Sequence, residues 1–353
     1  MYIYAIHTPY HLFRALSIAW RNKTKSHIFI IFGDFLVNNR YMPNLETVNI
    51  DVVLLEGSYK KGIITRNLVQ RELISKVDGI LKLHNKIEKV YLFADHIPVS
   101  QYIGFYCKKN CDSVVVKVED GMEAYVDYMY KNSKFATFLK KVIYGRFYEP
   151  LDYQGAFSFN DYLLVSFPNC VSSNLRRKFG LRIGKLPTDL SFVRKAYEDI
   201  LFGVKQIIYS KICDKGVREL IIVLLPLSEI TRDNIESVYA QLISEHSRDV
   251  GKLLLAKYHP REHRYYMGSL NSSGIILPQE IPAELVHVVV KEFLEKQVIE
   301  KVLILGNIST SLLTARDILG FSSNVTIRAV AQAVDYNFSL LESLYRNLHI
   351  ELA

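Results

Sequence analysis

Short apolar runs alternate with amphipathic segments over the N-terminal third of the chain. Residues 2–6 are apolar and β-prone, and apolar side chains then recur every three or four positions over residues 12–20, which is the spacing of a helix with one buried face. Thr8 suits the N-cap of that helix and Pro9 its first position, where a missing N–H costs nothing. The further elements expected here are strands at residues 27–32, 52–55, 90–94 and 113–118 and helices at residues 67–83 and 100–108.

The alternation restarts at residue 219, after a middle segment, residues 121–202, that is rich in tyrosine and basic residues and weakly periodic. We expect this middle segment to hold helices and loops that wall a cleft. Alternating strands and helices are typical of a parallel, doubly wound sheet, so the chain is predicted to be an α/β protein with two such domains, residues 1–210 and 211–353. The elements expected in the second domain are strands at residues 219–225, 252–258, 302–305 and 325–329 and helices at residues 235–244, 284–295, 311–319 and 339–348.

Two doubly wound, Rossmann-like domains that face each other leave a cleft at the carboxyl ends of both sheets, where such folds bind their ligands. This arrangement, called GT-B, is common among glycosyltransferases that use nucleotide sugars. A fold by itself does not establish a function, so the function has to be argued from the polar residues that follow the predicted strands.

Charge and composition narrow the function classes. Lysine and arginine total 44 against 36 aspartates and glutamates, so the net charge is 44 − 36 = +8. This excess fits an acidic substrate or an anionic membrane surface, but no single basic block favours nucleic acid. Four cysteines are too few for a disulfide scaffold, the N-terminus lacks the pattern of a signal peptide, and the longest apolar stretches are about half a membrane span. We therefore expect a cytoplasmic protein without a transmembrane helix.

An acidic pair followed by glycine, Glu119-Asp120-Gly121, comes directly after a predicted strand. Adjacent carboxylates raise one another's pKa unless cations neutralise them, and a carboxylate against a sugar hydroxyl can act as a general base. The glycine allows a sharp turn. Taken alone, this tripeptide is explained more simply as an ordinary acidic turn.

His259 and Pro260 follow another predicted strand and lie between Lys257 and Arg261. Proline at the first position of a helix would place His259 at the cap, beside an anion site, where it could donate a proton or a hydrogen bond to a phosphate. A polar turn is one alternative. A metal pair with His263 is another, although no third ligand is evident.

Three hydroxyl groups, those of Ser309, Thr310 and Ser311, precede or begin the helix expected at residues 311–319. Together with the free N–H groups of a helix N-terminus they can hold a phosphate, and a simple N-cap is the alternative. Two further polar clusters that follow predicted strands are Thr8-Pro9-Tyr10-His11 and the weaker Leu225-Pro226-Leu227-Ser228-Glu229.

Several common nucleotide and hydrolase motifs are absent from the sequence. It contains no G-x-G-x-x-G after the first strand, no G-x-x-x-x-G-K-[ST] and no G-x-S-x-G. No two aspartates stand two positions apart, so the Asp-x-Asp metal clamp of many nucleotide-sugar enzymes is missing as well. A phosphate leaving group would then be stabilised by histidine, lysine, hydroxyls and helix dipoles, with no metal.

The order of these clusters resembles the motif set of the bacterial sialyltransferase superfamily: an acidic pair with glycine late in the first domain, then His-Pro, then a Ser/Thr pair. The sequence is similar to the lipooligosaccharide sialyltransferases and the capsular polysialyltransferases over most of its length. Its acidic pair is Glu-Asp, where the simplest family pattern has Asp-Asp. The stretches that carry the resemblance are residues 8–11, 119–125, 226–229, 257–261, 281–284 and 309–310.

The resemblance implies an inverting, metal-independent transfer from CMP-sialic acid, or a related CMP-activated nonulosonic acid, with no other cofactor. Glu119 or Asp120 would take the proton from the acceptor hydroxyl, and His259 would stabilise or protonate the leaving CMP phosphate. The first domain would carry the base and the second would bind the nucleotide, its last helix packing back on the first. The residues implied in donor binding are Ser309, Thr310, Ser311, Lys257, Pro260, Glu284 and Ser228, and those implied in acceptor binding are Thr8, Pro9, His11 and Gly121.

The expected partners are the CMP-activated sugar and an oligosaccharide or glycolipid acceptor such as lipooligosaccharide, O-antigen or capsule, with peripheral attachment to the inner membrane and a homodimer as further expectations. Three alternatives stay open: a CMP-Kdo, legionaminic or pseudaminic acid donor, a non-catalytic protein that binds anionic glycans, and a GT-B-like epimerase or hydrolase. The basic candidates for membrane contact are Arg14, Lys23, Lys25 and residues 131–146.

Overall fold

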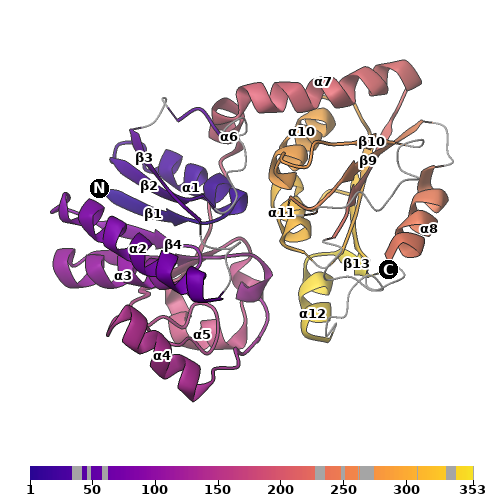
Figure 1. Cartoon of the computed structure of the whole chain (residues 1–353). Helices are drawn as coiled ribbons and strands as arrows, with labels where there is room; N and C mark the ends of the chain where they lie inside the picture. Colours follow the sequence, from indigo (N-terminus) through magenta and orange to yellow (C-terminus); the bar gives the residue numbers. More distant parts are fainter. Residues whose placement is uncertain are drawn as a thin grey trace. The chain divides into compact units, whose positions relative to one another are not determined.

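The computed structural model describes residues 1–33, 42–45, 49–57, 63–226, 235–247, 251–260, 262, 274–307, 309–330 and 339–352. The chain divides into two compact units, Met1–Asn39 with Asn44–Ala196, and Arg40–Pro43 with Tyr197–Ala353. Each unit is built around one parallel β-sheet (Figure 1). The division after Ala196 assigns α7 (Glu198–Lys215) to the second unit, whereas the boundary predicted from the sequence, at residue 210, falls inside this helix.

The first unit has a seven-stranded sheet in the order β3-β2-β1-β4-β5-β6-β7, and every neighbouring pair is parallel. The doubly wound sheet expected from the alternation is confirmed. Its strands are β1 (Tyr2–Ile6), β2 (His27–Phe32), β3 (Ile50–Leu55), β4 (Lys89–Leu92), β5 (Val114–Val118), β6 (Tyr162–Val165) and β7 (Ile183–Lys185). Its helices are α1 (Pro9–Arg21), α2 (Ile63–Lys82), α3 (Pro98–Cys111), α4 (Lys134–Tyr144), α5 (Ser173–Phe179) and α6 (Leu190–Ala196).

Burial in this sheet follows from the position of each strand. β1 and β2 lie inside the sheet and are buried along their whole length, as expected for parallel strands covered on both faces. β3 lies at an edge, and Val52 and Leu54 are exposed there. A core cluster joins α2 and α3 to the sheet, with Leu73 and Ile103 packed in the same cluster as Ile3.

Two strands, β6 and β7, come from the middle segment that was expected to hold only helices and loops, so that expectation was wrong for them. They have four and three residues, which is too short for an alternation of apolar and polar positions to be recognised. Pairing with β5 selects the strand conformation, since Leu164 lies opposite Val118 and the Glu119 N–H donates to the Leu164 carbonyl at 2.9 Å. β5, at whose end the acidic pair lies, therefore has a neighbouring strand on each side, β4 and β6.

The second unit has a six-stranded parallel sheet in the order β10-β9-β8-β11-β12-β13. The four predicted strands are confirmed, and the two- and three-residue strands β10 and β13 were not predicted. None of the described helices in either unit is long and apolar enough to cross a membrane. The strands are β8 (Glu219–Leu224), β9 (Lys252–Lys257), β10 (Ile275–Ile276), β11 (Lys301–Gly306), β12 (Val325–Ala329) and β13 (Ile350–Leu352), and the helices after α7 are α8 (Ile235–Ser247), α10 (Ala283–Glu295), α11 (Thr310–Leu319) and α12 (Ser339–Asn347).

In each sheet the chain order reverses beside the first strand. The reversal lies between β1 and β4 in the first unit and between β8 and β11 in the second. Parallel sheets bind ligands beyond the carboxyl ends of the strands at such a reversal, because the following loops diverge there. The segments that begin at His7, at Leu225 and at Asn307 follow β1, β8 and β11, so they are the first places to look for a site.

Candidate active site

Glu119, the first residue of the acidic pair, is buried and its oxygens are occupied by hydrogen-bond donors. Oε1 accepts from the Tyr10 hydroxyl at 2.5 Å and from the Ser166 hydroxyl, and Oε2 accepts from the Tyr125 hydroxyl and the Ser166 N–H, the latter at 2.8 Å. The Arg14 guanidinium lies 3.5 Å from Oε1. A carboxylate enclosed in this way has its charge compensated and presents no free oxygen to a substrate.

Arg14 belongs to this same buried group. It is 1% exposed, and its guanidinium donates to the Ser166 hydroxyl at 2.8 Å and to the Thr188 hydroxyl at 2.9 Å. Its suggested role in membrane contact is therefore wrong, because a side chain inside the first unit cannot reach a lipid headgroup. No local pattern indicates this burial, since an arginine on an amphipathic helix usually faces solvent.

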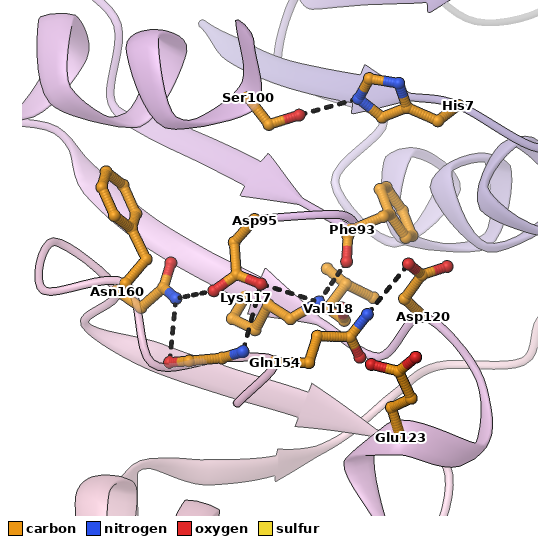
Figure 2. Close-up of polar contacts among 12 residues, drawn as sticks. His7, Phe93, Asp95, Ser100, Lys117, Val118, Asp120, Glu123, Gln154 and Asn160 are labelled. Atoms are coloured by element: carbon orange, nitrogen blue, oxygen red, sulfur yellow. Dashed lines mark hydrogen bonds and ion pairs between the residues drawn. The ribbon is translucent and has the colours of Figure 1, made fainter. Parts of the chain in front are cut away.

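Asp120 differs from its neighbour because its side chain is 20% exposed. Its Oδ1 lies 2.5 Å from His11 Nε2, and its Oδ2 accepts from Gln154 Nε2 at 3.0 Å (Figure 2 shows the second contact). The His11 ring is buried, and its Nδ1 accepts from the His7 N–H at 3.1 Å. Because Nδ1 is an acceptor, the proton of a neutral His11 is on Nε2, which donates to Asp120.

The charges around Asp120 favour its ionised form. Burial raises the pKa of Asp120. The charge and hydrogen bond of His11 lower it, as do the charges of Lys117 and His96, and the net result is a pKa of about 2. The carboxylate is therefore ionised at neutral pH, partly exposed, and held in one orientation by donors on both oxygens. A carboxylate in this state can accept a proton from a hydroxyl group held against it.

A second layer of polar groups lies behind Asp120 at the end of β5 (Figure 2). The Lys117 ammonium is buried and donates to the Phe93 and Val118 carbonyls, the latter at 2.8 Å, and lies 3.8 Å from the Asp95 carboxylate. Asn160 donates to the other oxygen of Asp95 at 2.9 Å. These contacts tie β4, β5 and the loop before β6 together beneath the acidic pair.

The backbone around the pair agrees with the expected turn and cap. Gly121 has φ 95° and ψ −142°, a conformation essentially restricted to glycine, so the tight turn after Asp120 requires this residue. Thr8 caps α1 and accepts from the His11 N–H at 3.2 Å, and Pro9 occupies the first turn. Thr8 thereby fixes the start of the helix that carries His11 to Asp120.

In the second unit, α11 begins directly after β11 and presents hydroxyl groups at its start. Ser309 is the N-cap residue, with extended backbone, but its side chain makes no capping bond. Its hydroxyl oxygen is buried and has no hydrogen-bond partner among the residues the structure describes. Thr310 and Ser311 follow in the first turn, where the N–H groups are free of intrahelical partners. An unpartnered hydroxyl beside the positive end of a helix suits an anion such as a phosphate.

Lys257, at the end of β9, is held by backbone carbonyl groups. Its ammonium donates to the Tyr258 and Gln279 carbonyls, both at 2.7 Å, and the side chain is buried. Burial lowers the pKa of Lys257 to about 8, and the nearby charges of Glu284 and Glu280 oppose that shift. Glu284 itself lies in the first turn of α10 and is buried.

His259 and Pro260 follow β9 in irregular backbone and a turn. The His259 carbonyl accepts from the Glu262 N–H at 2.9 Å and from Gln279 Nε2 at 2.8 Å, so the backbone of this turn is fixed. Pro260 is exposed. The helix expected after Pro260, Arg261, the metal-pair residue His263 and Ser228 with its neighbours 227 and 229 lie outside the described residues.

Metal ligands do not gather in the described part of the chain, where no group of three or more histidine, cysteine, aspartate or glutamate side chains could hold an ion.

Two residues that surround Asp120, Lys117 and Gln154, were not predicted from the sequence. A charge inside the apolar run of β5 was an available indication for Lys117, since lysine is seldom fully buried without partners. Gln154 had none, because it comes from a loop far along the chain.

Comparison with solved structures identifies the fold. The chain is similar to an α/β-galactoside α-2,3-sialyltransferase from Photobacterium phosphoreum, with 15% identity, a TM-score of 0.62, and coverage of 99% of this chain and 97% of the other. It is also similar to the GT-B domain of a sialyltransferase from Photobacterium damselae, with 13% identity, a TM-score of 0.57 and coverage of 100% and 99%.

The same fold occurs in enzymes of another class. A UDP-GlcNAc 2-epimerase from Neisseria meningitidis bound to UDP-GlcNAc gives a TM-score of 0.53 at 13% identity, covering 87% of this chain and 78% of the other. No protein-family model and no curated protein matches the sequence. The two parallel sheets, their strand order and these similarities together show that the chain has a two-domain, Rossmann-like GT-B fold.

Proposed function

We propose that the chain is an inverting, metal-independent glycosyltransferase that moves sialic acid, or a related nonulosonic acid, from a CMP-activated donor to a hydroxyl of a surface oligosaccharide. The observation that carries the proposal is the contrast within the acidic pair. Glu119 is enclosed by four donor contacts, whereas Asp120 is ionised, partly exposed and oriented by His11 and Gln154. We therefore assign the general base to Asp120 and a supporting role to Glu119.

In the proposed reaction, the acceptor hydroxyl attacks the anomeric carbon of the donor while Asp120 takes its proton. The bond between that carbon and the CMP phosphate breaks, and the electron pair leaves with the phosphate. A base with a pKa of about 2 suits an oxocarbenium-like transition state, in which bond breaking leads and the hydroxyl becomes acidic only late in the step. His11 has no exposed ring surface, so its proposed part is to position Asp120; Thr8, Pro9 and Gly121 position the same group.

We propose that the donor binds to the second unit. The Ser309 hydroxyl, together with Thr310, Ser311 and the N–H groups of α11, would bind the phosphate, and His259 would donate to it as it leaves. The residues proposed to border the nucleotide are Lys257, through the backbone that it fixes, with Pro260, Glu284 and Ser228.

The test is CMP release from CMP-sialic acid with and without a galactose-terminated oligosaccharide, in the presence of EDTA. Asp120→Asn should reduce kcat by roughly 100- to 10,000-fold while CMP affinity, measured by calorimetry, stays unchanged. Glu119→Gln is the matched control. It should lower thermal stability and reduce kcat less than Asp120→Asn does. His259→Ala should reduce the acceptor-dependent rate, and Ser309→Ala should weaken CMP binding.

Two results would contradict the proposal in different ways. Full activity of Asp120→Asn with loss in Glu119→Gln would move the base to Glu119. Absence of CMP binding together with binding of UDP would remove the donor assignment and favour a UDP-sugar enzyme, the class to which the epimerase with the same fold belongs.

A further inference from the structure

One helix of the first unit, α4, is fixed to the domain by its inner side. Tyr144 forms an aromatic cluster with Phe147 and Tyr148, and this cluster packs against side chains of α2 and α3. The Tyr144 hydroxyl donates to Asn67 Oδ1 at 2.7 Å. The orientation of the helix is therefore set, and the remaining side chains of its outer surface are presented to the surroundings.

That outer surface carries a stripe of large apolar side chains. Phe135, Phe138, Leu139 and Val142 are 71%, 64%, 42% and 68% exposed. Their spacing of three, one and three residues places all four on one face of a helix, opposite Tyr144. Single exposed apolar residues are ordinary on protein surfaces, but a contiguous stripe at helical spacing indicates a binding surface.

The charge around the stripe has one sign. Residues 131–146 contain five basic side chains and no aspartate or glutamate. Lys134 and Lys141 are exposed and border the stripe along one side of the helix, and neither forms an ion pair within the described parts of the chain. Lys140 is turned toward the domain, 5.9 Å over the Tyr148 ring. The five basic side chains are Lys131, Lys134, Lys140, Lys141 and Arg146.

We propose that α4 lies in the plane of an anionic lipid bilayer, with Phe135, Phe138, Leu139 and Val142 inserted between headgroups and the flanking lysines on lipid phosphates. A helix with an apolar face, a basic border and a firm attachment to its domain is suited to an interfacial position. Charge decides between this occupant and a second copy of the chain, because pairing two α4 stripes would bring ten cations together. In Figure 1, α4 lies at the outer edge of the first unit.

The experiment is cosedimentation of the full chain with large vesicles of phosphatidylcholine alone or of phosphatidylcholine with about one third phosphatidylglycerol. Wild type should bind the anionic vesicles and lose binding in high salt. Phe135→Ser/Phe138→Ser should reduce the partition coefficient by at least about 10-fold, and Lys134→Gln/Lys141→Gln by roughly 20- to 30-fold at low salt, about five-fold for each lysine. Leu83→Ser/Leu181→Ser, which changes exposed apolar residues elsewhere in the first unit, should bind as wild type.

Each contrary result overturns the proposal. The first is no binding of wild type to anionic vesicles, and the second is an equal loss of vesicle binding in the Leu83/Leu181 control. The third is a wild-type dimer that becomes a monomer in Phe135→Ser/Phe138→Ser while vesicle binding is unchanged, which would assign the stripe to a second copy of the chain. Thermal unfolding of every variant excludes misfolding as the cause. Vesicle binding needs neither donor nor acceptor, so its failure is distinct from failure of the proposed transferase reaction.

Discussion

The acidic pair shows how two adjacent carboxylates can be given different environments. Glu119 faces into the first unit and accepts from tyrosine and serine hydroxyls, while Asp120 faces the surface beside His11. The two residues directly follow β5, where successive side chains point to opposite sides of the sheet, and the chain then turns at Gly121, with φ 95°. One residue is therefore suited to stabilise the fold and the other to do chemistry.

The buried Arg14–Glu119 group should be sensitive to loss of one partner. Arg14→Met leaves Glu119 buried without the guanidinium that lies 3.5 Å from it, so the free energy of unfolding of the first unit should fall by about 3–5 kcal/mol. The lone tryptophan, Trp20, stacks on Phe192 with ring centroids 4.5 Å apart, and its fluorescence in urea reports this unit. Arg21→Met, an exposed change in the same helix, is the control and should change stability by less than about 0.5 kcal/mol.

The contact between His11 and Asp120 should be visible in the pH dependence of the proposed reaction. As the proposed base, Asp120 would work in its ionised form, and with a pKa of about 2 it stays ionised at and well below neutral pH. His11→Phe removes the group that lowers this pKa, so burial raises it and the acid limb of the pH–rate profile should move to higher pH. An unmoved acid limb, with the variant folded, would contradict the role given to His11.

At the scale of elements, α10 carries a buried histidine beneath the start of α11. Burial lowers the pKa of His287 to about 4, with a weak opposing effect of the Ser311 backbone. The unfolded chain takes up this proton near pH 6.5 and the folded chain only near pH 4, so stability is full above pH 6.5 and falls as the pH drops between these values. The loss at pH 4 should be roughly 3 kcal/mol.

Calorimetric unfolding of wild type and His287→Leu between pH 7.5 and pH 4.5 measures this effect. Leucine cannot titrate, so the variant should lose part of the pH dependence while the buried volume stays filled. His7, in the first unit, also has a pKa well below the ordinary value because it is buried, and it remains in both proteins as an internal reference. An identical decline in the two proteins would contradict the prediction.

The sequence predicted the elements that have strong local patterns and missed those that tertiary pairing creates. β1, β2, β8 and β9 are long apolar runs followed by turns or caps, and all were predicted. β6, β7, β10 and β13 have two to four residues, and they are strands because a neighbour offers free backbone groups. Propensity alone cannot reveal such pairing.

Prediction of the candidate site from the sequence reached the same limit as prediction of the strands. Residues that belong to a compact motif, such as Asp120 and Ser309, could be found because the motif is contiguous and follows a strand. Gln154 reaches Asp120 from 34 residues away and Arg14 reaches Ser166 from 152 residues away. These contacts depend on the folded chain, so no local pattern records them.

At the scale of the whole molecule, the two units should respond differently to nucleotide. If CMP binds the second unit, CMP at 100 times its Kd should stabilise that unit by about 2.7 kcal/mol and raise its calorimetric transition. The transition reported by Trp20 in the first unit should stay unchanged. Ser309→Ala should require more CMP for the same shift, and an equal shift in this variant would argue against a phosphate site at α11.

The lengths of the outer strands bear on a different property, the tendency of chains to join edge to edge. Of the described strands, β7, β10 and β13 close three sheet edges with only two or three residues each, and such short edges offer few free N–H and C=O groups to another chain. β3 has six residues at the fourth edge, with Leu54 52% exposed. Polymerisation through added strands should therefore start at β3, and Asp51 is the acidic residue in that strand that opposes it.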